Sequence, residues 1–176
     1  MKSDVILIDS NGDGFQRATE ETWKVAGYVG LSRKESLRLQ LCTEEMLCLL
    51  RSVTGEAQAS FWIECDKNRC ELHLTTKTEM NKEKRSMLLF TATSRKNEAA
   101  GTFLGKVRDA FEVAMMREAD PIDQIPEDIL PDLPNHVINS LEWDGYERSV
   151  LKNVSDEVKV GIRGRMVDLT VCRNFA

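Results

Sequence analysis

Four oxygen-bearing side chains near the N-terminus have the spacing of a calcium-binding loop. Asp9, Asn11, Asp13 and Glu20 match the pattern D-x-N-x-D-G-x5-E. The surroundings disagree, because the β-branched run at 5–8 predicts a strand before the loop, where a calcium loop of this kind requires a helix. A turn between strand and helix accounts for the same residues. We therefore expect no metal, and calcium binding by these four residues stays an alternative.

The other reactive side chains form no recognisable catalytic arrangement. His73 and His136 are far apart in the sequence and are both expected to be solvated, so they offer no acid–base pair. The cysteines do not have the C-x-x-C spacing of a metal site, and we expect reduced thiols in the cytoplasm, although Cys65 and Cys70 could cross-link on oxidation. The chain has five cysteines, which are Cys42, Cys48, Cys65, Cys70 and Cys172.

One carboxylate stands on an apolar stripe of a predicted helix. Ser32 and Glu35 have the spacing of a capping box, and a helix is predicted from there to about Val53, ending at Gly55. Its broad apolar face must be core: Leu39, Cys42, Met46, Leu49, Leu50 and Val53. A second, narrower stripe contains Leu37, Leu41, Glu44 and Cys48. Glu44 sits either at the rim of the domain or in a cleft that this stripe lines.

The remaining patterns predict an α+β domain. A first helix is expected over 15–28, an antiparallel hairpin over 59–75, a helix over 98–117 and a second hairpin over 158–173. The helix over 98–117 has one apolar face, made by Ala100, Phe103, Leu104, Val107, Phe111, Ala114 and Met115. Residues 118–135 hold all four prolines and predict a loop, followed by a helix over 136–154. We expect one domain over 1–176, with helices on one face of a mixed or antiparallel sheet.

Charge narrows the classes of partner. The net charge of −5 argues against a protein that binds nucleic acid, and no apolar run approaches the ~20 residues of a membrane span. Residues 77–97 carry six basic and two acidic side chains, whereas 118–135 carry six acidic and no basic ones. These two segments could attract each other or dock a charged protein, although solvated faces are the usual outcome.

Two stretches resemble the GHKL ATPases, the histidine kinase-like family, and the anti-sigma-factor serine kinases within it. Residues 38–50, with Thr43-Glu44-Glu45-Met46, resemble the N-box helix, and 151–171 resembles the last helix and closing hairpin. The resemblance covers about 3–76 and 137–174. It implies a Bergerat-type two-layer sandwich in which the segment 77–135 is an inserted, enlarged helical lid region. It also implies a protein partner such as a sigma factor or an anti-anti-sigma protein.

The family's ligands for Mg-ATP are incompletely present. Glu44 matches the family's glutamate, but Cys48 stands where the family has a magnesium-binding asparagine, and a neutral thiol is a poor ligand for this hard cation. Residues 75–81 contain neither the aspartate nor the glycines of the adenine-reading segment. The sequence therefore predicts a regulatory protein-binding module without catalysis or cofactor. The alternative is a serine kinase that binds ATP or ADP with magnesium through Glu44 and Cys48.

Overall fold

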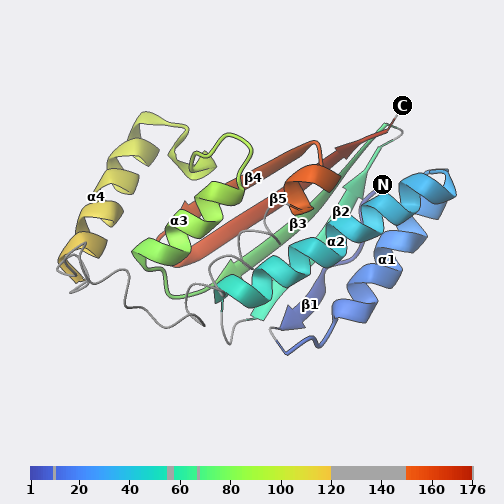
Figure 1. Cartoon of the computed structure of the whole chain (residues 1–176), viewed down its shortest axis with the longest axis horizontal. Helices are drawn as coiled ribbons and strands as arrows, with labels where there is room; N and C mark the ends of the chain where they lie inside the picture. The colour runs from blue at the N-terminus through green and yellow to red at the C-terminus, as the bar shows by residue number, and fades with distance from the viewer. Residues whose placement is uncertain (10, 55–57, 67, 120–149, 176) are drawn as a thin grey trace, which may run out of the picture.

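The computed structural model describes residues 1–9, 11–54, 58–66, 68–119 and 150–175 (Figure 1). Its strands are β1 (Ile6–Asp9), β2 (Gln58–Cys65), β3 (Arg69–Lys77), β4 (Glu157–Arg163) and β5 (Met166–Asn174). Its helices are α1 (Phe15–Tyr28), α2 (Arg33–Thr54), α3 (Lys82–Thr91), the 3-10 turn η1 (Glu98–Ala100) and α4 (Phe103–Ala119). Residues 150–154 are also helical. The α+β class is confirmed.

The five strands form one sheet in the order β1-β2-β3-β5-β4. Every neighbouring pair of these named strands is antiparallel, so of the two expected kinds of sheet the antiparallel one is confirmed and the mixed one is wrong. Two of the four pairings are hairpins, β2–β3 and β4–β5, which connect antiparallel neighbours directly. Phe61 lies opposite Leu74, and Leu72 lies opposite Val171, so apolar residues of adjacent strands share one face. A slip of one residue would move them to the other face, which fixes the register.

Helices α1, α2 and α3 lie over that apolar face (Figure 1), and the core fills the space between the two layers. The predicted inner face of α2 is confirmed, because each of its six residues is at most 5% exposed. The capping box is confirmed too: Ser32 N–H donates to Glu35 at 2.7 Å, and Glu35 N–H donates to Ser32 Oγ at 3.3 Å. None of the helices within the described residues is both long and apolar enough to span a bilayer.

A glycine permits α1 to begin close to β1. Gly14 has φ +85°, and a Cβ there would lie 2.4 Å from the carbonyl oxygen of Leu7. No larger side chain fits this position without moving the strand. The turn before it is the predicted strand-to-helix connection, in which Asp9 Oδ1 accepts hydrogen bonds from the backbone N–H groups of Asn11 and Asp13.

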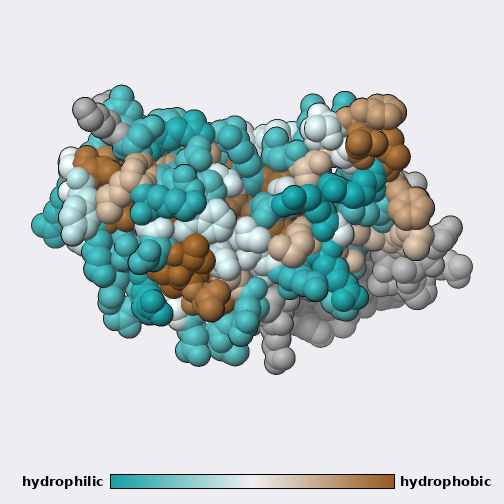
Figure 2. Space-filling view, turned by 180° about the vertical axis from the view of Figure 1, so that it is seen from behind, coloured by the Kyte–Doolittle hydropathy of each residue, from teal (hydrophilic) through white to brown (hydrophobic). Residues whose placement is uncertain are grey.

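The other face of the sheet is open and largely hydrophilic, as Figure 2 shows from behind the view of Figure 1. His73 lies on this face and is not fully solvated, because its ring stacks on Trp62 with the centroids 4.9 Å apart. Burial is the main cause that lowers the pKa of His73 below its ordinary value of 6.5, which favours the neutral ring at neutral pH.

The described part of the region between β3 and β4 contains the helices α3, η1 and α4, which differs from the expectation of one helix over 98–117. The chain forms η1 and α4, separated at residues 101–102. Asn97 Oδ1 accepts a hydrogen bond from Ala99 N–H, and Thr102 Oγ1 accepts one from Gly105 N–H, so each helix has its own N-terminal cap. The predicted helix end at Gly55, the loop over 120–135 and the helix residues 136–149 lie outside the described residues.

The segment before η1 covers the outer edge of β4 with side-chain and backbone groups. Thr93 N–H donates to the carbonyl oxygen of Val158 at 2.9 Å, and Val158 N–H donates to Thr93 Oγ1 at 2.8 Å. Four residues further along β4, Ile162 N–H donates to Asn97 Oδ1 at 2.7 Å, and the carbonyl oxygen of Ile162 accepts from Asn97 Nδ2 at 2.9 Å. Asn97 and Thr93 thus satisfy backbone groups that another strand would otherwise pair.

Cys65 and Cys70 form a disulfide at the end of the β2–β3 hairpin, so the expectation of reduced thiols is wrong for these two. The register places them directly opposite each other, with Cα atoms 4.1 Å apart. Cys42, Cys48 and Cys172 are outside this bond.

Neighbouring residues of β1 provide a test of which face is core. Ile8 is 2% exposed and Leu7 is 70% exposed. We expect Ile8→Ala to lower the free energy of unfolding by about 2–5 kcal/mol, because it removes buried apolar groups and leaves a cavity. Leu7→Ala is the matched control and should change it by about 0.5 kcal/mol or less. Urea denaturation measures both, and equal losses would contradict the assignment of faces.

Candidate functional site

Helix α4 presents a wide apolar surface to solvent. Phe103 is 80% exposed, Leu104 78% and Phe111 65%, while Val107 and Met115 are each 54% exposed. At 100° per residue these five occupy a sector of about 120°, which the exposed Ala110 widens to about 140°, and no residue of 103–115 within it is charged. We call this surface the α4 stripe, defined by Phe103, Leu104, Val107, Phe111 and Met115. In Figure 2, apolar residues gather at the right-hand edge of the molecule, where α4 begins.

The opposite side of α4 attaches the helix to the domain through polar contacts. Asp109 accepts hydrogen bonds from Arg85 of α3 and from the side-chain amide of Asn97. Glu112 accepts one from the backbone N–H of Gly164, in the β4–β5 turn, at 3.0 Å. The Arg85 side chain is only 8% exposed, so its charge is stabilised mainly by Asp109. These contacts set the rotation of α4 about its axis and turn the stripe outward.

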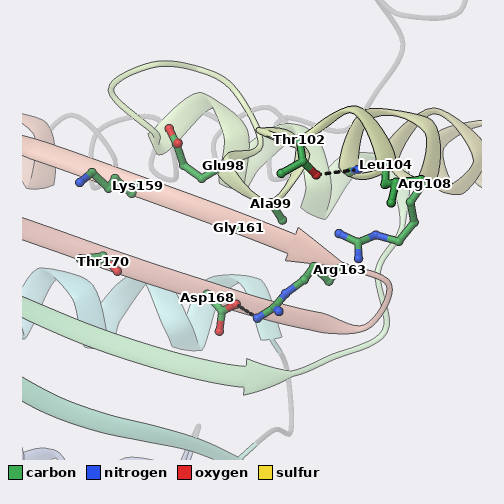
Figure 3. Close-up of a pocket in the computed structure, with 11 residues that line it drawn as sticks. Glu98, Ala99, Thr102, Leu104, Arg108, Lys159, Gly161, Arg163, Asp168 and Thr170 are labelled. Carbon is green, nitrogen blue, oxygen red and sulfur yellow. Dashed lines mark hydrogen bonds and ion pairs between the residues drawn. The ribbon is translucent and has the colours of Figure 1, made fainter.

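A cavity of about 610 Å³ lies under the first turns of α4, above the open face of β4 and β5 (Figure 3). Gly105 brings α4 close to η1, since a Cβ at this position would lie 2.5 Å from the carbonyl oxygen of Ala99. Leu104, which belongs to the α4 stripe, and Arg108, which borders it, both line the cavity. The cavity and the stripe are therefore continuous.

Basic side chains dominate the charge that the cavity can offer a ligand. It is lined by the cations Arg108, Lys159 and Arg163 and by the carboxylates Glu98 and Asp168. Asp168 uses one oxygen to accept from Thr75 Oγ1 at 2.9 Å and the other to pair with Arg163, as the dashed line in Figure 3 shows. Its carboxylate is thus occupied within the fold.

The pairs made by the other two cations are weak. Arg108 lies 3.4 Å from Glu112 and Lys159 lies 3.3 Å from Glu157, and both cations are at least 40% exposed. Exposed ion pairs of this kind contribute little, so these side chains can turn toward an anion at small cost. The lining residues include no histidine or cysteine, which leaves the cavity without a general base that titrates near neutral pH. The arrangement is suited to binding.

The residues that resemble the N-box lie elsewhere, on the exposed side of α2. Glu44 and Cys48 are both exposed, and so are Leu37 and Leu41, so the second stripe of α2 lies at the surface rather than in a cleft. Glu44 accepts a hydrogen bond from Gln40 Nε2 at 2.8 Å. Neither residue lines the cavity under α4. The interpretation of Glu44 as a rim residue fits this placement.

The calcium-loop residues make local hydrogen bonds. Asp9 caps its own turn, as described above, and Glu20 accepts a hydrogen bond from Gln16 Nε2 at 2.8 Å. Over the part of the chain that the structure describes, no three or more His, Cys, Asp or Glu side chains are grouped as a metal would require. Asp9, Asn11 and Asp13 serve the turn that leads into α1.

Three residues that position α4 were not identified from the sequence as site residues. Arg85 and Asp109 are charged residues 24 positions apart, and Asn97 precedes a predicted helix. The available signal was the net positive charge of 77–97, together with one aspartate in a helix whose other side is apolar. Neither pattern specifies which basic residue is buried.

A scan of protein-family models found no match to this chain, and a search of curated proteins found none either. Its function is therefore argued from the geometry of α4 and the cavity.

The ion pair that positions α4 should have a large effect on stability. We expect Asp109→Ala to lower the free energy of unfolding by about 3–5 kcal/mol, because it leaves the Arg85 charge buried without its carboxylate. Arg108→Ala, one residue earlier and exposed, is the matched control and should cost about 0.5 kcal/mol or less. If urea denaturation gives similar values for both, the pair does not anchor the helix.

Thiol labelling tests the N-box alternative. Burial raises the pKa of the Cys42 thiol to about 12, so iodoacetamide should modify Cys42 only after unfolding, whereas exposed Cys48 should react in the folded chain. Mg-ATP should leave the rate at Cys48 unchanged, as measured by mass spectrometry of the labelled peptides. Protection of Cys48 by Mg-ATP, absent in Glu44→Gln, would instead support nucleotide binding on α2.

Proposed function

We propose that this chain is a regulatory protein-binding module without catalytic activity, which holds its partner on helix α4. The observation that carries this proposal is the α4 stripe, where five large apolar side chains remain 54–80% exposed. Surface patches of this kind on a folded domain mark interaction sites, because contact with water leaves their hydrophobic stabilisation unused. The buried contacts of Arg85, Asn97 and Asp109 hold the stripe in this orientation.

The resemblance to the GHKL ATPases is consistent with the proposal. The elements follow the order that the resemblance implies, with a strand, two helices and a hairpin before the 77–135 region and a hairpin after it. Helix α4 belongs to that enlarged region, and the N-box residues Glu44 and Cys48 lie on a different, exposed surface. A Bergerat-type domain that has exchanged nucleotide binding for partner binding accounts for both features. A sigma factor or an anti-anti-sigma protein is the partner class that the resemblance implies.

Site-specific photo-cross-linking in the cells that produce the protein tests this function. A benzophenone amino acid at Val107 should give an adduct with another protein, because the stripe is buried in the complex. The same group at Tyr28, which is 78% exposed on α1, is the matched control and should give none. Adding Phe111→Asp should remove the Val107 adduct by placing a charge in the apolar contact.

Each other result of this experiment contradicts the proposal. An adduct of twice the chain mass would mean that a second copy covers the stripe. A cross-link within one chain would mean that the chain's own residues cover it. Equal labelling from Val107 and Tyr28 would mean that the contacts are random. Because Phe111 is 65% exposed, Phe111→Asp should leave the unfolding free energy within about 0.5 kcal/mol, which separates lost binding from lost folding.

A further inference from the structure

The border of the α4 stripe is positively charged. Lys106 lies on one side of the apolar sector and Arg108 on the other, and both are exposed. The acidic residues Asp109 and Glu112 of the same helix are instead directed toward the domain, where they accept hydrogen bonds from Asn97 and from Gly164. A ligand on the stripe therefore meets apolar surface in the middle and cations at both borders.

The dimensions of the stripe match a helix of a partner. From Phe103 to Met115 the axis rises about 18 Å, or roughly three turns. Side chains at 103, 107, 111 and 115 repeat every four residues, forming a ridge of the type that packs between the ridges of another helix. An amphipathic helix laid along it would present apolar positions at matching intervals.

A second copy of this chain fits the stripe less well. Two α4 helices packed together would bring basic borders against basic borders, which is unfavourable. The charge of the border therefore favours a ligand of opposite charge over a second copy of this chain.

The cavity under α4 extends this site at one end. Leu104 and Arg108 line it, and Arg163 and Lys159 add positive charge from β4. Figure 3 shows Arg108 descending from α4 toward the strand that carries Arg163. A carboxylate entering from the end of the stripe would meet the weakly paired Arg108 and Lys159, and Arg163, which binds Asp168 through Nη2; Glu98 is the other carboxylate of the lining.

We infer that the partner's docking element is an acidic amphipathic helix, whose apolar ridge covers the α4 stripe and whose terminal carboxylate enters the cavity between Arg108 and Arg163. This inference rests on the proposed protein-binding function and specifies the chemistry of its ligand.

Two synthetic helical peptides with the same apolar ridge test the inference on the full chain. One has glutamates beside the ridge and at the end that reaches the cavity, and the other has lysines at those positions. Fluorescence anisotropy should show the glutamate peptide binding about tenfold or more tightly than the lysine peptide, with affinity that falls as NaCl is raised. Phe111→Asp should abolish binding of both.

Charge variants then locate the acidic contact. Arg108→Glu and Arg163→Gln should each weaken the glutamate peptide about tenfold. Lys34→Glu changes a charge on exposed α2 and should leave affinity unchanged. A double-mutant cycle between Arg163→Gln and a glutamine at the peptide's terminal glutamate should show coupling, which a general loss of folding would not produce.

The outcomes separate this inference from the function on which it rests. Equal affinity for the two peptides, equal loss with Lys34→Glu, or no binding of either peptide overturns the acidic helix. The adduct at Val107 can still appear in those cases, and the protein-binding function would stand with a ligand of other chemistry. If Val107 gives only self-adducts or intrachain links, the function itself fails.

Discussion

The buried ion pair between Arg85 and Asp109 determines how the region between β3 and β4 is organised. Arg85 comes from α3, and its carboxylate partner comes from α4, so the pair joins two helices that have few other attachments. Asn97 binds the same carboxylate and also the backbone of Ile162 in β4. Because a buried charge requires its partner, α4 can dock only with Asp109 inward. The apolar side of the helix then has to face away from the domain.

The geometry reverses the usual relation between a helix and its core. On α2 the apolar residues Leu39, Met46 and Val53 are buried, and every charged residue is exposed or half-buried. On α4 the charged Asp109 and Glu112 meet the domain, while Phe103 and Phe111 meet solvent. Hydrophobic burial thus holds the two-layer domain together, whereas polar contacts hold the binding helix to it. The function proposed for α4 depends on this division.

The periodicity of apolar residues was sufficient to predict the elements that have one face in the core and the other in solvent. Alternation along β2 and β3 predicted the hairpin, and the spacing of Ser32 and Glu35 predicted the start of α2, because these signals are local. The same information could not orient α4, since an apolar face has the same pattern whether it meets a core or a partner. Nor could it show that Asn97 and Thr102 provide separate caps, which divide the helix expected over 98–117.

The candidate site was harder to predict for a related reason. Glu44 drew attention because it stood on an apolar stripe, yet Leu37 and Leu41 of that stripe are 51% and 36% exposed. A stripe predicts a contact, and only the tertiary structure shows whether a contact exists. The cavity under α4 gathers residues from η1, α4, β4 and β5, so Arg108 is separated from the cations of β4 by about fifty residues in sequence. Spacing rules for local motifs do not extend over that distance.

The contacts that Thr93 and Asn97 make with β4 have a consequence for the way this protein can associate. By occupying the outward N–H and C=O groups of Val158 and Ile162, they deny another chain the backbone template offered by an uncovered sheet edge. Strand addition and edge-to-edge aggregation are therefore blocked on the β4 side, close to where α4 exposes its apolar residues. The protein can therefore expose apolar residues there without aggregating through its sheet, because contacts between side chains do not add strands to β4.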